Sequence, residues 1–346
     1  MRRYRRTLVA TALMATLVSG TAGWAAGSGQ RAVDGPPPGT AAWRDDASFG
    51  RALPDPASAT PAQVAAFFGT LSATKRRELT ERHPSVVGNL DGAPVQLRYR
   101  ANELAIAKDP RYSRLAEPGR QILAFDPRGR GTVAEVYGDL LTSRHVAVVV
   151  PGSDIDAGTY DRSKDPYGTP AGMATSLRAA TDGRTAVVAW AGYTTPVGVG
   201  MDAATGGLAE VGARRLARFT EGLTAAGART PALFCHSYGS VVCGLAASEV
   251  AASDIVAVGS PGMRADSADA LRTDARVWAA KDPSDWISKV PNVEFLGLGH
   301  GPDPAAKSFG ARRVPARTAH GHTGYFAPGT DSLRAFASIA TGGDVR

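Results

Sequence analysis

From Gln121 onward, short runs of apolar and β-branched residues alternate with longer segments of helical periodicity. This alternation predicts an α/β fold, a mostly parallel twisted sheet with crossover helices. A long helix with one apolar side is predicted between the fourth and fifth strands, and a last helix over Ser332–Ala340. The predicted strands are Ile122–Phe125 and Val133–Tyr137, which form a hairpin, then Val146–Val150, Thr185–Trp190, Pro231–Cys235, Ile255–Val258 and Arg276–Ala280.

From residue 57 to residue 110 the chain has only helical patterns. Thr60 is followed by a proline and then by Gln63, the arrangement of a helix start with a capping box. Four apolar residues after it have the spacing of one buried helix face, and two more helical segments follow, the second over Val95–Ala107. We therefore predict a small helical segment over residues 57–110 that packs on a main domain over residues 111–346.

The first residues have the pattern of an export signal. Four arginines among the first six residues precede an apolar run from Leu8 to Val18, and small residues then offer a cleavage site near Ala25 or Ala26. We predict a signal peptide over residues 1–26 and a secreted protein. The alternative is an uncleaved membrane anchor, which needs about 20 apolar residues, more than this run provides.

The composition and charge of the chain bear on its organisation and on its possible partners. Residues 27–56 are rich in glycine and proline without periodicity, which predicts a disordered linker. The formal net charge is +7, and removing the four leader arginines leaves +3 (7 − 4). So small a residual charge gives no basis for nucleic-acid binding. No stable protein partner is predicted.

The segment from Cys235 to Gly239 lies between a predicted strand and an apolar helical run. In that context the pattern G-x-S-x-G places a serine on a strained turn, with its hydroxyl above the sheet. The flanking positions must be small, and Cys235 stands where glycine is usual. We predict that Ser237 is a nucleophile; the alternative is a solvent-exposed serine in a tight turn. His236 is predicted to point away from the nucleophile and to be structural.

A serine nucleophile of this type is followed in the chain by an acid and then by a histidine. Asp282 and Asp285 both follow the last predicted strand, and we favour Asp285; the alternative role is a helix N-cap. His322 lies on a loop just before the final helix and is the predicted base, with His320 as the next candidate. His300 comes too early and is predicted to be a loop histidine.

An oxyanion hole needs two backbone N–H groups, one after the nucleophile and one after the third strand. Tyr238 provides the first, and for the second we favour Ser153 over Asp154. Several aspartates nearby, at positions 154, 156, 161 and 165, suggest calcium, but their spacing does not match that of a calcium-binding loop. No metal or other cofactor is predicted.

The two cysteines are predicted to form a disulfide. Cys243 lies four residues after Gly239, on the helix face that approaches the strand ending at Cys235. An oxidising compartment lets such a bond persist. The alternative is two buried free thiols.

Six separated stretches, in order over about residues 60–330, carry a resemblance to a known family. They are His83–Pro94, Arg98–Asn102, Ala191–Pro196, His236–Ser240, Phe309–Ala311 and Gly321–Tyr325. On these stretches the chain resembles the α/β-hydrolase domain of actinobacterial, often exported, proteins long catalogued as a domain of unknown function. The resemblance implies an α/β-hydrolase fold, with Ser237 as nucleophile, His322 as base and Asp285 as acid. It implies no particular substrate.

Together these residues predict a secreted serine hydrolase acting on a small-molecule or lipid ester. Acyl transfer to a cell-envelope alcohol would use the same residues, and an inactive binding module could keep the same fold. The apolar loop from Gly192 to Ala204 is predicted to line a substrate pocket or to form a lid, with Tyr193 and Met201 as the substrate-binding candidates.

Overall fold

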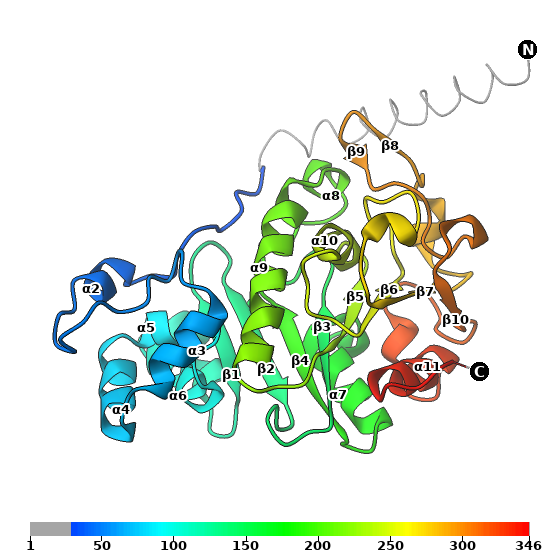
Figure 1. Cartoon of the computed structure of the whole chain (residues 1–346). Helices are drawn as coiled ribbons and strands as arrows, with labels where there is room; N and C mark the ends of the chain where they lie inside the picture. The colour runs from blue at the N-terminus through cyan, green and yellow to red at the C-terminus, as the bar shows by residue number, and fades with distance from the viewer. Residues whose placement is uncertain (1–28, 346) are drawn as a thin grey trace, which may run out of the picture.

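The computed structural model describes residues 29–345, and its centre is an eight-stranded sheet in the order β1-β2-β4-β3-β5-β6-β7-β10 (Figure 1). The pairs β1–β2 and β2–β4 are antiparallel and the other five are parallel, so the sheet is mostly parallel and begins with a hairpin, as predicted. The strands are β1 (Ile122–Asp126), β2 (Thr132–Tyr137), β3 (His145–Val150), β4 (Thr185–Ala191), β5 (Ala232–His236), β6 (Asp254–Val258), β7 (Arg276–Ala280) and β10 (Arg312–Val314); β8 (Glu294–Phe295) and β9 (Leu298–Gly299) form a separate hairpin.

Helices cover both faces of the sheet. Neighbouring strand residues point to opposite faces, so that Val148 and Val149 of β3 belong to different apolar clusters. On one face lie α9 (Gly207–Ala225) and α10 (Gly239–Ala246), and on the other α7 (Pro170–Ala180) and α11 (Asp331–Ala340). The shorter helices are α8 (Met201–Ala204), η1 (Pro110–Ala116), η2 (Pro166–Gly168), η3 (Asp269–Leu271), η4 (Trp286–Lys289), η5 (Lys307–Phe309) and η6 (Gly324–Phe326).

The N-terminal helices lie beside β1 (Figure 1) and have an apolar cluster of their own. Thr60 and Gln63 form the predicted capping box at the start of the first of them. The segment contacts the main domain through its last helix against β1 and its first against α9. These helices are α3 (Pro61–Gly69), α4 (Ala73–Arg82), α5 (Pro84–Val87) and α6 (Val95–Ile106).

The prediction of a disordered linker is wrong for residues 29–56. This segment contains α2 (Thr40–Arg44), and its Trp43 is fully buried against the N-terminal helices, with Nε1 donating to the carbonyl of Pro54 at 2.8 Å. One large aromatic side chain provides enough apolar area to anchor a segment that has no periodicity. Residues 27–28 and the predicted signal peptide lie outside the described residues.

Within residues 29–345, no helix combines the length and the apolar character that crossing a membrane requires.

Candidate active site

Ser237 lies in the turn between β5 and α10, with φ at +54° in the left-handed region. A non-glycine residue in that region is strained and needs support from its surroundings. The Ser237 N–H donates to the carbonyl of Val258 at 2.9 Å, and its carbonyl accepts bonds from the N–H and Oγ of Ser240 at 2.9 and 2.6 Å. The turn is therefore the strained strand–turn–helix that the sequence predicts.

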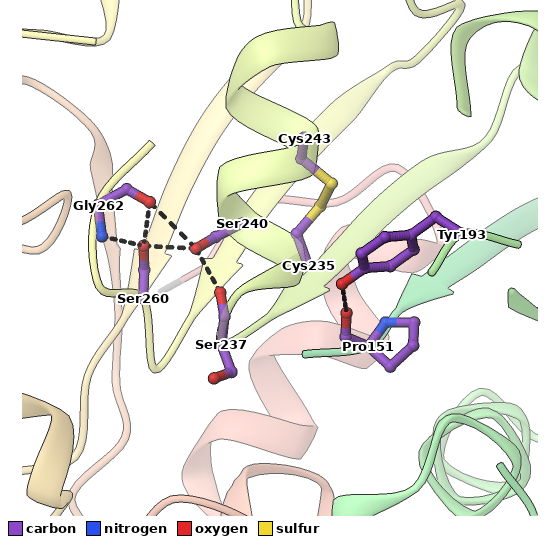
Figure 2. The surroundings of a disulfide bond; sticks show 8 residues. All are labelled: Pro151, Tyr193, Cys235, Ser237, Ser240, Cys243, Ser260 and Gly262. Atoms are coloured by element: carbon purple, nitrogen blue, oxygen red, sulfur yellow. Dashed lines mark hydrogen bonds between the residues drawn. A yellow bond between two sulfur atoms is a disulfide. The ribbon is translucent and has the colours of Figure 1, made fainter. Parts of the chain in front are cut away.

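Two buried hydroxyl groups, those of Ser240 and Ser260, lie beside this turn and support it (Figure 2). Ser240 Oγ lies 2.6 Å from Ser260 Oγ, which in turn accepts a bond from the N–H of Gly262 at 3.0 Å. Ser260 is not among the residues predicted from the sequence. Its only signal was its place just after a predicted strand, since no motif marks it.

Two glycines allow β3 and its following loop to approach the turn closely. A Cβ at Gly239 would lie 2.4 Å from the carbonyl oxygen of Val150, which explains why this position must be small. A Cβ at Gly152 would lie 2.6 Å from Ser237 Cβ and 2.9 Å from its Oγ. Val150 and Cys235 are paired in register on the parallel strands β3 and β5. Gly152 and Ser237 each lie two residues further along the chain, so they come to lie side by side.

The predicted disulfide between Cys235 and Cys243 is confirmed (Figure 2). The two Cα atoms are 6.4 Å apart, one on β5 and the other on α10, and both side chains are fully buried. The bond thus joins the strand and the helix on either side of Ser237. The substitution of glycine by Cys235 is accommodated because the side chain is bonded into the apolar core.

The structure brings His322 and Asp285 together, 37 residues apart in the chain. His322 Nδ1 lies 2.9 and 3.0 Å from the two carboxylate oxygens of Asp285, whose side chain is completely buried. The carboxylate also accepts bonds from the N–H of Ile287 at 2.9 Å and the hydroxyl of Tyr325 at 2.7 Å. With Nδ1–H as the donor, Nε2 of the neutral ring is left as a proton acceptor.

The charge of Asp285 follows from these contacts. Burial raises the pKa of this carboxyl group, but hydrogen bonds and charge interaction with His322, together with the bonds from Ile287 and Tyr325, outweigh it. The pKa of Asp285 therefore lies below its usual value, and the group is ionised at neutral pH. An ionised acid is suited to orient a histidine and to stabilise its protonated form.

The alternative acid and base occupy different places. Asp282 accepts bonds through Oδ1 from the N–H and hydroxyl of Ser284, and through Oδ2 from the backbone N–H of His320 at 2.9 Å. It joins two loops, and within residues 29–345 no hydrogen bond links it to a histidine ring. His320 itself is exposed, with φ at +56°.

Ser237 and His322 are linked through His236. The neutral ring of His236 donates from Nε2 to the carbonyl of His322 at 2.7 Å, and the two rings lie 4.8 Å apart. Burial lowers the pKa of His236 to about 3. No hydrogen bond of the described residues joins Ser237 Oγ to His322, a bond that often tightens only in the substrate complex.

Two backbone N–H groups beside Ser237 have no partner within residues 29–345. These are the N–H groups of Tyr238 and Ser153, the pair predicted for an oxyanion hole. The N–H of Asp154, the alternative, already donates to the carbonyl of Pro196 at 2.8 Å. A Cβ on the adjoining Gly152 would lie 3.1 Å from Tyr238 N, so the two segments meet at the serine.

The prediction that Tyr193 lines a substrate pocket is wrong. Its side chain is buried, its ring stacks on Trp190 at 5.9 Å, and its hydroxyl donates to the carbonyl of Pro151 at 2.7 Å (Figure 2). Tyr193 instead fixes the loop that carries Ser153. Met201, at the start of α8, is 50% exposed and remains a candidate for substrate contact.

Three of the four aspartates after β3 have separate surroundings. Asp154 accepts a bond from the N–H of Gly198 at 2.8 Å, Asp156 lies 3.4 Å from Arg130, and Asp161 pairs with two other arginines. No group of three or more His, Cys, Asp or Glu side chains in residues 29–345 has a geometry that could hold a metal ion.

Residues 126–295 match a protein family described as alpha/beta hydrolase. The match runs from the end of β1 to β8 and contains Ser237 and Asp285. The strand order and this match together show that the chain has an α/β-hydrolase fold, as its sequence resemblance implied.

Two relatives are similar along most of the chain. Both are described as uncharacterized proteins of Mycobacterium tuberculosis, from strains CDC 1551 / Oshkosh and H37Rv, and each is 28% identical over 376 aligned residues. The alignment covers 84% of this chain but only 57% of each relative. This chain therefore spans little more than half of the length of these curated relatives.

Solved structures with a similar arrangement are more distant. A dienelactone hydrolase from Anabaena variabilis is 15% identical, with a TM-score of 0.40 over 61% of this chain and 90% of that chain. An esterase domain from a Rhodothermus marinus protein is 14% identical, with a TM-score of 0.35 over 62% of this chain and 93% of that chain.

Proposed function

We propose that the protein is a secreted serine hydrolase that cleaves carboxylic esters through Ser237, His322 and Asp285. The observation that carries this proposal is the buried Asp285 carboxylate bonded to His322 Nδ1. The pair lies at the carboxyl ends of the parallel strands, where Ser237 occupies its strained turn. Three residue types in three separate loops make up a nucleophile, a base and an orienting acid.

The reaction follows from these positions. His322 Nε2 takes the proton of Ser237 as Oγ bonds to the ester carbonyl carbon, and the N–H groups of Tyr238 and Ser153 stabilise the oxyanion. His322 then passes that proton to the leaving alkoxide as the carbon–oxygen bond breaks. Water, activated by the same histidine, releases the carboxylic acid and restores the serine.

Export is part of the proposal. The predicted leader favours it, and a disulfide that links β5 to α10 is consistent with an oxidising compartment. Expression of the full chain in a secreting host, followed by N-terminal sequencing of protein from the medium, tests this directly. Protein that stays in the cell with Met1 intact would contradict it.

The test of catalysis compares the wild type with Ser237→Ala on p-nitrophenyl esters from acetyl to palmitoyl, near pH 8. We expect the substitution to reduce kcat by about 10⁴-fold or more, since the nucleophile is lost. Ser253→Ala, in the loop before β6, is the matched control and should retain activity. A folded wild type that hydrolyses none of the esters would overturn the proposal.

A further inference from the structure

The large apolar side chains that the described residues leave exposed are not scattered. Seven of the eight lie on two loops at one end of the molecule, and the eighth, Leu141, lies elsewhere, in the loop after β2. We call the seven the apolar rim. They are Val197, Val199 and Met201 after β4, and Trp286, Val293, Phe295 and Leu296 after β7.

The two loops of the apolar rim are joined to each other. His300 Nε2 donates to the carbonyl of Ala203 at 2.7 Å, and Arg264, packed against Gly206, donates to the carbonyl of Gly297 at 2.9 Å. In Figure 1, α8 and the β8–β9 hairpin accordingly lie at the same end of the molecule. The rim is therefore one surface formed by two loops.

This surface is continuous with the candidate active site. The ring of Trp286 lies 4.7 Å from the ring of His322. On the other side, the side chain of Asp154 accepts a bond from the N–H of Gly198, and the N–H of Asp154 donates to the carbonyl of Pro196. These bonds connect the rim loop after β4 to Ser153, which precedes Asp154 in the chain. Tyr238 follows Ser237 in the chain, and its hydroxyl donates to the carbonyl of Thr205, just after α8, at 2.8 Å.

The apolar rim carries almost no charge. Residues 192–201 contain no Asp, Glu, Lys, Arg or His, and residues 286–299 contain only two residues of these types, Lys289 and Glu294. Glu294 lies 3.3 Å from Arg264, which compensates its charge. An exposed apolar surface with so little charge complements uncharged acyl chains, whereas protein docking sites usually have a polar, charged border.

We propose that the apolar rim docks on aggregated lipid, so that the substrate of Ser237 is a lipid ester presented at a lipid surface. The inference rests on the proposed ester hydrolysis and names its substrate class. Because the rim contacts His322, whatever binds the rim must leave Ser237 accessible to substrate. A lipid surface meets this condition because it is itself the source of the ester. A stably bound protein on the same face would obstruct it.

The binding test uses the full chain, secreted by an expression host, with Ser237→Ala so that no ester is consumed. The probe is phosphatidylcholine vesicles, and binding is measured by co-sedimentation. We expect Leu296→Asp and Phe295→Asp, introduced on this background, each to weaken the vesicle partition coefficient by about tenfold, because each places a charge in the lipid contact. Leu141→Asp is the matched control, with the same change at an exposed leucine outside the rim, and should bind like its parent.

The possible results distinguish lipid docking from misfolding, from dimer formation and from a failure of the proposed ester hydrolysis. Thermal unfolding of the variants near that of the parent excludes misfolding as the cause of weaker binding. Equal binding by the rim and control variants, or no vesicle binding by the parent, would overturn the docking surface even if the wild type hydrolyses p-nitrophenyl acetate. A dimer in solution that Leu296→Asp dissociates would assign the rim to a second copy and also overturn it. Vesicle binding without hydrolysis of any ester would refute the proposed function and leave the lipid contact standing.

Discussion

Gly152 and Ser237 are so close that a single added methyl group at Gly152 would collide with the serine side chain. The position of that Cβ is 2.6 Å from Ser237 Cβ and 2.9 Å from its Oγ. Gly152 also precedes Ser153, whose N–H has no partner within the described residues. One glycine thus sets the distance between the nucleophile and the loop proposed to bind the oxyanion.

Gly152→Ala should therefore reduce activity more than stability. Overpacking typically costs about 1–3 kcal/mol, whereas a displacement of about 1 Å among reacting groups can cost about 10²-fold in rate. We expect kcat/KM on a p-nitrophenyl ester to fall by about 10²-fold while the fold persists. Gly207→Ala, where nothing lies within 4 Å of the added Cβ, is the control. Unchanged kinetics in Gly152→Ala would show that the loop moves without consequence.

The two candidate acids can be separated by paired substitutions. Asp285→Asn leaves the shape intact but removes the charge that orients His322, and we expect kcat to fall by about 10⁴-fold. Asp282→Asn replaces the carboxylate oxygen that accepts the His320 N–H by an NH2 group, so it removes the bond between the two loops. It should lower the free energy of unfolding by about 1–3 kcal/mol, with a much smaller effect on kcat. Steady-state kinetics and denaturant unfolding of both variants measure the contrast. A larger kinetic defect in Asp282→Asn would reverse the assignment.

Most of the sheet could be predicted from the sequence because buried parallel strands are short, continuous apolar runs. All seven predicted strands exist, but β10 was missed: two of its three residues are arginines, so it shows no apolar run. The anchoring of residues 29–56 was also missed, because it depends on Trp43, a single residue, and not on a repeating pattern. Periodicity reveals the buried face of a helix or strand, but it cannot reveal a single residue that anchors a segment.

The candidate site was predictable as far as chain order and motif determine it. Ser237, Asp285 and His322 could be chosen because the order of nucleophile, acid and base is fixed in this fold. The role of Tyr193 could not be foreseen: its place in an apolar loop is compatible with a pocket lining or with the core, and only its bond to Pro151 decides between them. Ser260 acts through a contact with Ser240 across 20 residues, which no local pattern encodes.

The disulfide should stabilise the turn that holds Ser237. Closing a loop of eight residues corresponds to about 2.5 kcal/mol in the chain-entropy treatment. We expect Cys235→Ala with Cys243→Ala to lower the free energy of unfolding by about this amount, measured by urea denaturation. A reducing agent should destabilise the wild type similarly and leave the double variant unchanged. Equal sensitivity of both proteins to the reducing agent would show that the bond is not formed in solution.

His236 should make the protein less stable as the pH falls. Burial lowers its pKa from 6.5 to about 3, so between these values the unfolded chain binds a proton that the folded protein does not. The stabilisation is complete above about pH 6.5 and is lost as the pH falls toward 3, at up to about 1.4 kcal/mol per pH unit for one proton. The same direction holds for His300, whose pKa is also lowered by burial.

Replacing His236 isolates its share of this slope. Glutamine can place an amide N–H where Nε2 donates to the carbonyl of His322, and it does not titrate. Urea unfolding of His236→Gln between pH 6 and pH 4.5, above the range where the lowered pKa of Asp285 matters, should show a slope smaller than that of the wild type by about one proton. His320→Gln, at an exposed position, is the control. An undiminished slope in His236→Gln would mean that the buried ring is already protonated in the folded protein, and that its hydrogen bond to His322 involves a charged donor.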